Sequence, residues 1–227
     1  MYKLFVPEVK VIGVTMPVVD YIPEAEDLIS YTARVSNPSN QENFGTAEGL
    51  LKYCIRNSHW SIFEMSNLVM EIKAPRDISR QILRHKSGNF QEFSQRYSEV
   101  TDDMFVLREM RMQDTDNRQN SLEADDEFLS NWWLGEQSAS IDSARVLYQT
   151  ALKNDIAKEQ ARCVLPEGNT MSNMYMNGTM RTWLHYVGLR SGNGTQKEHV
   201  MVAEACREAI KDYFPTLIQT LKGDNNE

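Results

Sequence analysis

The sequence predicts an α+β fold, a helix-dominated single domain over residues 1–227 with a small, mostly antiparallel sheet. Apolar residues recur at helical spacing through most of the chain, whereas period-two alternation is confined to short stretches. No internal repeat, low-complexity tract or linker rich in Gly, Ser or Pro divides the 227 residues. Because a chain of this length can bury one sizeable core, we expect one domain.

The strands are expected in the first half of the chain. Alternation of apolar and polar residues predicts one or two strands over residues 2–15 and another over 68–73. Apolar residues at helical spacing predict helices over residues 24–35, 46–56 and 75–85, the last with a proline in its first turn.

The second half is predicted to be mainly helical. Residues 101–120 are charged and carry few bulky side chains, so we expect a surface excursion there. Helical spacing then predicts one long helix or a helix pair over residues 122–152. Further helices are expected over residues 156–164, 180–189 and 197–213.

Composition narrows the function classes. The net charge of −8, from 24 basic and 32 acidic residues, argues against a protein whose whole surface binds nucleic acid. The mean hydropathy of −0.51 and the lack of a long apolar run or a secretory signal predict a cytoplasmic protein with no membrane partner. Neither the three cysteines nor the four histidines have zinc-ligand spacing, so no metal site is expected.

A local basic cluster over residues 76–96 could bind an anion. Arg76, Arg80 and Arg84 recur every four residues and therefore share one helix face. A solvated basic face explains this pattern about as well as an anion site does. The following turn combines Gly88 with hydroxyl, amide and guanidinium donors, which favours a phosphate held by Arg84 and Arg96.

A second basic concentration lies about a hundred residues later. It contains Arg162, Arg181, His185 and Arg190, of which Arg181 and His185 share a helix face. Arginine is common near the C-terminal end of a helix, where it offsets the dipole, so Arg190 alone is explained structurally. A functional role for Arg190 requires that it meet the first cluster in space.

One motif in the first cluster resembles a family signature. Arg84-His85-Lys86, seven further residues and then Ser94 are similar to the signature of the flavin-dependent thymidylate synthases, with Lys86 in place of its second arginine. Three other segments resemble that family in the same order: residues 59–64 (HWSIFE), residues 161–166 (ARCVLP) and Leu189-Arg190 followed by Gln196 and Glu198. Several spaced motifs in order are more specific than one short pattern.

The resemblance implies an enzyme that converts dUMP to dTMP. In this family 5,10-methylenetetrahydrofolate supplies the carbon, NADPH supplies the reducing power through FAD, and homotetramers share active sites between subunits. The flavin-contacting positions of the family match Ser61, Arg84, His85, Lys86, Glu92, Thr179, Arg181 and His185. The dUMP-contacting positions match Gln81, Arg84, Glu92, Phe93, Ser94, Gln95, Arg96, Arg162 and Arg190. Arg190 would be the catalytic residue, since a guanidinium beside the pyrimidine stabilises developing negative charge.

Two other function classes stay open. The first is a non-catalytic nucleotide- or RNA-binding module that uses the basic residues 76–96 and stacks bases on Phe90, Phe93 and Tyr97. The second is a methyltransferase with Cys163 as nucleophile, although a cysteine is more commonly a small buried apolar residue. For Ser94 no base defines a triad, so we interpret it as a substrate contact.

Other conspicuous side chains have structural explanations. Cys54 and Cys206 lie on apolar faces and are expected in the core. The pair Trp132-Trp133 and the methionines of residues 171–180 could form a ring-binding surface, but packing in the core or between subunits is the favoured interpretation.

Overall fold

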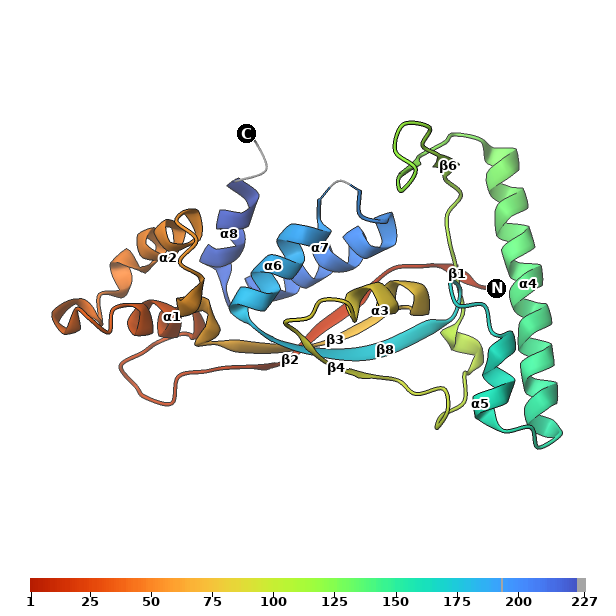
Figure 1. The fold of residues 1–227 in the computed structure, drawn as a ribbon, viewed down its shortest axis with the longest axis horizontal. Helices are drawn as coiled ribbons and strands as arrows, with labels where there is room; N and C mark the ends of the chain where they lie inside the picture. The colour runs from red at the N-terminus through yellow and green to blue at the C-terminus, as the bar shows by residue number, and fades with distance from the viewer. Residues whose placement is uncertain (193, 224–227) are drawn as a thin grey trace.

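A four-stranded antiparallel sheet forms the centre of the computed structural model, which describes residues 1–192 and 194–223. Its order is β2 (Glu8–Val14), β3 (Asn67–Pro75), β8 (Met171–Thr179) and β4 (Asn89–Glu92). Every neighbouring pair is antiparallel, and β3 pairs with β8 along the full length of both strands. This mixture of helices with small antiparallel sheets confirms the predicted α+β class (Figure 1).

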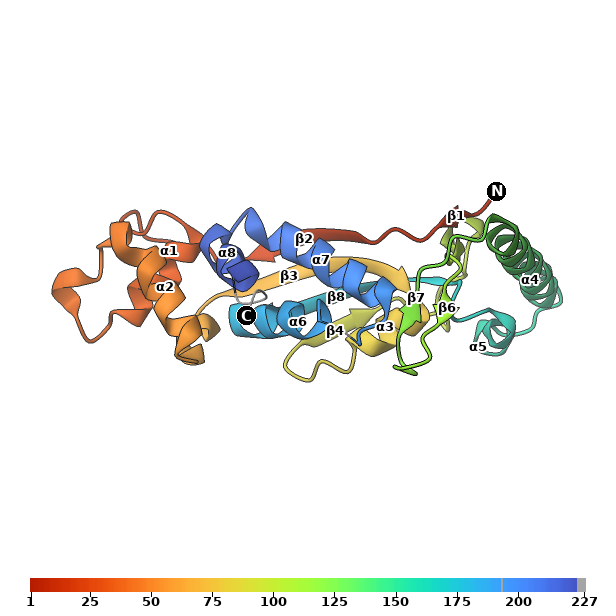
Figure 2. The same ribbon diagram turned by 90° about the horizontal axis from the view of Figure 1, so that it is seen from above.

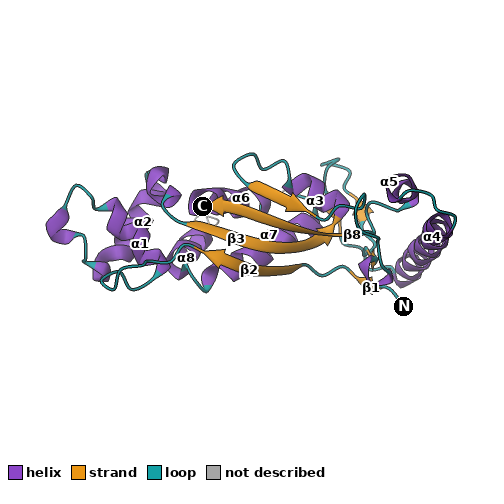
Figure 3. Cartoon of the chain, turned by 90° about the horizontal axis from the view of Figure 1, so that it is seen from below, coloured by secondary structure: helices purple, strands orange, loops and turns teal. Residues whose placement is uncertain are grey.

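Helices cover one face of this sheet, as Figures 1 and 2 show. They are α3 (Arg76–Ile82), α6 (Met180–Arg190), α7 (Lys197–Lys211) and α8 (Pro215–Gly223). The opposite face has no helical layer and is seen directly in Figure 3. A sheet covered on one side needs apolar residues at every second position, and alternate residues of β3 and β8 are accordingly buried.

The methionine-rich stretch belongs to the core. Met174 and Met176 of β8 and Met180 of α6 have no exposed surface, which confirms the packing interpretation. The sequence did not predict β8 itself, because methionine favours helices and residues 171–179 carry few β-branched side chains. Pairing with β3 and β4 on both sides imposes the extended conformation.

Helical layers also occupy both ends of the elongated molecule (Figure 1). One end carries α1 (Ala25–Ala33) and α2 (Ala47–Arg56), which confirm two predicted helices. The other end carries α4 (Glu127–Lys153) and α5 (Lys158–Ala161). Helix α4 is continuous through the exposed Gly135 and is therefore one long helix rather than a pair. The side chain of Asp126 caps it by accepting a 2.9 Å hydrogen bond from the Leu129 amide.

Residues 101–120, expected to run over the surface, divide into two parts. Phe105 and Leu107 are buried and form a second hydrophobic cluster with Ile141 and Tyr148 of α4. Residues 112 and 113 and most of the residues that follow are exposed. The segment contributes the short strands β5 (Val106–Leu107), parallel to β1 (Lys3–Leu4), and β6 (Met112–Gln113), antiparallel to β7 (Ser121–Leu122). Phe105 and Leu107 are thus enough to anchor the first part of the segment against α4.

The junction between β8 and α6 is tightly packed. A Cβ atom at Gly178 would lie 2.7 Å from Cγ2 of Thr182, which is closer than real contacts allow. Thr179 caps α6 by accepting a 3.3 Å hydrogen bond from the Thr182 amide. The buried indole of Trp183 donates a 3.0 Å hydrogen bond to the Leu68 carbonyl and so ties α6 to β3. The direction of α6 is therefore set at its first turn.

Short 3-10 helices complete the described chain: η1 (Pro38–Asn40), η2 (Phe44–Thr46), η3 (Trp60–Glu64), η4 (Asp102–Met104) and η5 (Arg162–Val164). None of the helices within residues 1–192 and 194–223 combines the length and the apolarity needed to cross a membrane.

Candidate active site

A buried polar cluster lies where the end of α3 meets α6 and the start of α7. Gln81 donates a 2.8 Å hydrogen bond from Nε2 to Oε1 of Gln196, and its own Oε1 lies 3.1 Å from Nδ1 of His199. The ring of His85 contacts the ring of Tyr186 edge-on, with centroids 5.5 Å apart. His199 and Tyr186 are fully buried, whereas Gln81, His85 and Arg190 are partly exposed, so the cluster reaches the surface of the helical layer.

Arg190 meets this cluster from the last turn of α6. Burial lowers the pKa of His85, and the nearby Arg190 guanidinium lowers it further. The same two causes, with His85 as a smaller third, lower the pKa of His199 to about 4. Burial raises the pKa of the Tyr186 hydroxyl well above its ordinary value. Both histidines are therefore neutral near pH 7, and Arg190 supplies the positive charge of the cluster.

Several buried atoms of the cluster have no hydrogen-bond partner. They are Nε2 of His85, Nε2 of His199, the Tyr186 hydroxyl, Nε of Arg190 and Oγ of Ser191. Unpaired buried polar atoms are uncommon in folded proteins and often indicate a ligand or ordered water. A polar ligand bound here could form hydrogen bonds with these unpaired atoms and lie close to the charge of Arg190.

A second group of predicted residues lines a cavity of about 300 Å³ between α3 and η5. Arg76, Arg80, Gln95 and Arg162 contribute to its wall. Gln95 is 4% exposed and its Nε2 has no partner, so an amide donor is buried there unpaired. Three guanidinium groups and an unpaired amide are donors suited to an anion with several oxygens.

The arginines around this cavity are partly neutralised. Arg76 lies 3.7 Å from Glu92, whose carboxylate also accepts a 2.7 Å hydrogen bond from Ser172. Arg80 is paired with Glu167. The predicted three-arginine helix face is incomplete, because α3 ends at Ile82 and Arg84 lies beyond it, exposed.

Arg96 and Arg162 meet at Glu159 beside the same cavity. Arg96 is paired with the Glu159 carboxylate at 3.1 Å, and Arg162 donates from Nε to the Glu159 carbonyl at 3.4 Å. Ser94 is exposed, while Phe93 is half-buried and donates its amide to the Asn173 carbonyl of β8 at 2.8 Å. The predicted loop over residues 87–96 thus begins with strand β4 before it reaches these side chains.

Most of the predicted flavin-contacting residues lie near α6, but Glu92 does not, since it contacts Arg76 and Ser172. Arg181 is paired with Glu64 of η3, and the His185 ring lies 4.6 Å from the Trp60 ring. Ser61 is exposed on η3. Burial lowers the pKa of His185, and Arg181 lowers it further. Arg84 and Lys86 are exposed on either side of His85, and Thr179 is the residue that caps α6.

The predicted dUMP contacts fall into two groups within the chain. Gln81 and Arg190 belong to the buried polar cluster, whereas Gln95, Arg96 and Arg162 surround the cavity at η5. Among the described residues, no hydrogen bond or ion pair joins the two groups. The motif order in the sequence gave no indication of this division.

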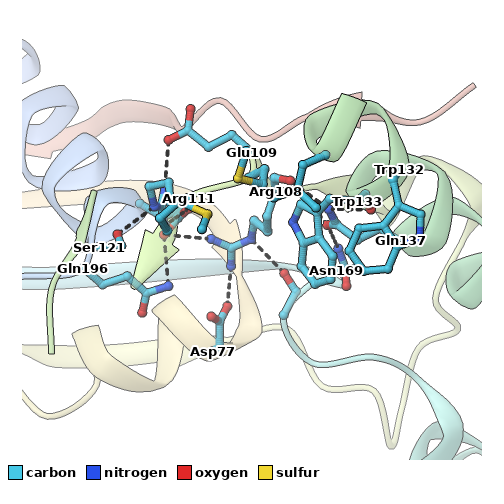
Figure 4. Close-up of a pocket in the computed structure, with 15 residues that line it drawn as sticks. Asp77, Arg108, Glu109, Arg111, Ser121, Trp132, Trp133, Gln137, Asn169 and Gln196 are labelled. Carbon is cyan, nitrogen blue, oxygen red and sulfur yellow. Dashed lines mark hydrogen bonds and ion pairs between the residues drawn. The ribbon is translucent and has the colours of Figure 1, made fainter. Parts of the chain in front are cut away.

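The motif-based prediction missed a third polar region, shown in Figure 4. Arg108 donates to Asp77 at 2.6 Å and to the Gly168 carbonyl at 2.9 Å, beside a cavity of about 560 Å³. Trp132 and Trp133 line this cavity and are 52% and 37% exposed, so they are not core residues. Arg108 lies in the segment expected to cross the surface, where no motif drew attention to it.

The cysteines and aromatic residues bear on the alternative functions. Cys54 and Cys206 are buried, as predicted, whereas Cys163 is exposed at the η5 cavity rather than buried. Phe90 packs against the core and is a poor stacking surface for a base. Tyr97 is 85% exposed and remains available for stacking.

Comparison with known proteins identifies the family. The family model described as thymidylate synthase complementing protein matches residues 17–216. A protein of Paramecium bursaria Chlorella virus 1, named probable flavin-dependent thymidylate synthase, is 50% identical over 93% of this chain and 97% of its own length. A flavin-dependent thymidylate synthase of Synechocystis is 46% identical over 95% of this chain and 99% of its own length.

A solved structure has the same fold. The UMP/dUMP methylase PolB of Streptomyces cacaoi, bound with 5-Br UMP, superposes with a TM-score of 0.83 at 24% identity. The match covers 98% of this chain and 96% of that one. The resemblance found in the sequence is thus confirmed by the family model and by relatives at up to 50% identity. The chain belongs to the family of flavin-dependent thymidylate synthases.

Proposed function

We propose that this protein is a flavin-dependent thymidylate synthase that converts dUMP to dTMP, with 5,10-methylenetetrahydrofolate as carbon donor and NADPH as reductant through FAD. The observation that carries the proposal is the position of Arg190 near His85 and His199, the second of which contacts Gln81. Arg190 acquires a functional explanation because His85, from the first basic segment about a hundred residues earlier, lies near enough for Arg190 to lower its pKa. The unpaired buried atoms around it support a polar ligand at this place.

Arg190 acts on the uracil ring in this proposal. Carbon 5 of the ring becomes nucleophilic when negative charge develops on the pyrimidine, and a fixed guanidinium stabilises that charge without losing its own proton. His85 and His199 are neutral, so Arg190 is the source of positive charge in this cluster. Gln81 would hold the ring through its amide.

The phosphate of dUMP is assigned to the cavity at η5. Arg162 and the unpaired Gln95 amide line this cavity, and Arg96 reaches the same Glu159 as Arg162. Arginine matches phosphate oxygens with two parallel hydrogen bonds, and Ser94 adds a hydroxyl donor. In the same set, Phe93 and Glu92 would fix the loop to β8.

The residues around α6 fit a flavin dinucleotide. A pyrophosphate requires local positive charge, which Arg84, Lys86 and Arg181 provide at exposed positions. The remaining matched positions are Ser61, His85, Glu92, Thr179 and His185. When bound, FAD would supply the hydride chemistry, and these residues would hold and orient it. Lys86 keeps the charge of the signature arginine but not its planar fork.

A homotetramer with active sites shared between subunits is part of the proposal. The dUMP set divides into two groups within one chain, and a second subunit that brings its η5 cavity to the α6 cluster would complete the site. Exposed apolar residues on α4, among them Phe128, Trp132 and Leu147, are suited to subunit contact. The free cysteines fit a reducing cytoplasm.

The visible absorption spectrum of the purified protein tests this function. We expect an oxidised-flavin spectrum that bleaches when NADPH is added without oxygen, and dTMP formation when dUMP and the folate are also present. A colourless protein that takes up no added FAD would overturn the proposal. Salt-dependent RNA binding in its place would favour the nucleic-acid module.

A further inference from the structure

Glu198, at the start of α7, is a buried carboxylate held by two arginines. Its residue is 3% exposed. Arg111 donates from Nη2 to both carboxylate oxygens, at 2.7 and 2.9 Å, and Nη1 of Arg108 lies 3.3 Å from Oε2. Burial of an unpaired carboxylate costs several kcal/mol by general estimates, so the two guanidinium groups are what allow it to stay charged here.

The charge state of Glu198 follows from its surroundings. Burial by itself would raise the pKa of this carboxyl, but Arg108 and Arg111 outweigh burial and hold the pKa below its usual value. The carboxylate is therefore ionised near pH 7. An ionised carboxylate accepts hydrogen bonds and cannot donate one.

Because the Glu198 carboxylate can only accept hydrogen bonds, it fixes the direction of the neighbouring hydrogen bonds. Gln196 lies 2.9 Å from Oε2 of Glu198 and must turn its NH2 group toward it. Its carbonyl then faces Gln81, which must donate from its own NH2 group at 2.8 Å. The carbonyl of Gln81 consequently faces Nδ1 of His199 at 3.1 Å, and His199 must carry its proton on Nδ1. The Asp77 carboxylate, which shares Arg108 with Glu198, also accepts from the Gln196 side chain. Two amide orientations and one tautomer thus depend on these two carboxylates, of which Glu198 is the more buried.

We propose that Arg108 and Arg111 are positioning residues for Gln81, acting through Glu198 and Gln196. Each stands in the segment that carries no family motif, and neither belongs to the predicted site. The fixed orientation leaves one N–H of the Gln81 amide without an acceptor among the residues that the structure describes. This N–H selects a nucleotide group that accepts a hydrogen bond, such as a ring carbonyl.

The inference rests on the proposed function only in the identity of that nucleotide, dUMP. The hydrogen-bond direction itself is a property of the free protein. It is therefore measured separately, so failure of the inference and failure of the proposed function are distinguishable.

Glu198→Gln is the decisive variant, because it keeps the shape of the side chain but can donate as well as accept. Gln196 then keeps only Asp77 as a carboxylate acceptor, so the reversed orientations of Gln196 and Gln81 become populated. We expect KM for dUMP to rise about tenfold with kcat changed less than about twofold, as the loss of one oriented hydrogen bond predicts. Glu109→Gln is the matched control: Glu109 also pairs with Arg111, at 2.8 Å, but lies outside the chain of amides.

The second readout is the tautomer of His199, followed by ¹⁵N NMR of histidine-labelled protein without substrate and assigned with His199→Asn. We expect a single Nδ1–H tautomer in the wild type and in Glu109→Gln, and a mixture in Glu198→Gln. An Nε2–H tautomer in the wild type, or an unchanged tautomer in Glu198→Gln, would overturn the inference. If Glu198→Gln does not fold, Gln196→Met decides instead, since it breaks the same chain and leaves both ion pairs in place.

Discussion

Acid should destabilise this protein through His199. The ordinary pKa of this group is 6.5 and burial beside Arg190 and His85 lowers it to about 4 in the folded chain. Between these two values the unfolded chain binds a proton that the folded chain does not, so protons favour unfolding. The effect is small above about pH 7 and grows as the pH falls through 6.5 toward 4.

The size of this effect follows from the two pKa values. A pH of 5 lies about 1.5 units below the pKa of the unfolded imidazole, whereas the folded imidazole is still mostly neutral. Each pH unit over which only the unfolded chain is protonated corresponds to about 1.36 kcal/mol of unfolding free energy. The free energy of unfolding should therefore drop by about 2 kcal/mol between pH 7 and pH 5 on account of His199 alone.

Urea unfolding followed by circular dichroism measures the effect, at one fixed protomer concentration because assembly also stabilises. His199→Asn is the comparison, since the asparagine amide takes the place of Nδ1 as donor to Gln81. We expect the variant to be less stable at pH 7 but to lose about 2 kcal/mol less than the wild type on going to pH 5. Equal losses in the two proteins would refute the assignment of a buried, neutral His199.

Three further outcomes are expected. Arg190→Ala should lower kcat for dTMP formation by about 100-fold or more while the circular dichroism spectrum is unchanged, because a fixed positive charge at the reacting ring is lost; near-normal turnover would remove Arg190 from the mechanism. Cys163→Ala should keep full activity in the same assay, whereas a cysteine-dependent methyltransferase would be inactive. Ile72→Ala, in the fully buried middle of β3, should lower the free energy of unfolding by about 2–5 kcal/mol in urea titrations, while Ile12→Ala on the half-exposed β2 should cost less than about 1 kcal/mol; similar losses at both positions would contradict the assigned core.

The parts of the fold with strong local patterns could be predicted from the sequence. The alternation around Leu68 and the helical spacing before Arg56 are properties of consecutive residues, and both elements are present. Strand β8 could not be predicted in this way, because its extended conformation comes from pairing with β3 and β4 rather than from its own residues. The same holds for β4, whose partner lies about eighty residues away.

The candidate site shows the same limit. The motifs singled out His85 and Arg190, which lie near each other in the structure, because each motif is local and its family context supplies the rest. The division of the dUMP contacts between two regions could not be read from motif order, because it depends on where α3 and η5 lie in space. The contribution of Arg108 was missed for a related reason: ion pairs across about ninety residues leave no periodic signal.

Gly178 lies in β8, two residues before α6 begins, and still bears on the position of Arg190. A Cβ atom at Gly178 would clash with Thr182 in the first turn of α6, and the helix ends at Arg190. The helix is about 16 Å long at a rise of 1.5 Å per residue, so a tilt of about 4° at its start displaces its end by about 1 Å. An error of that size at a reacting centre can cost about a hundredfold in rate. In the proposed mechanism, the absence of a side chain at Gly178 therefore helps to set the distance between the Arg190 guanidinium and the uracil ring.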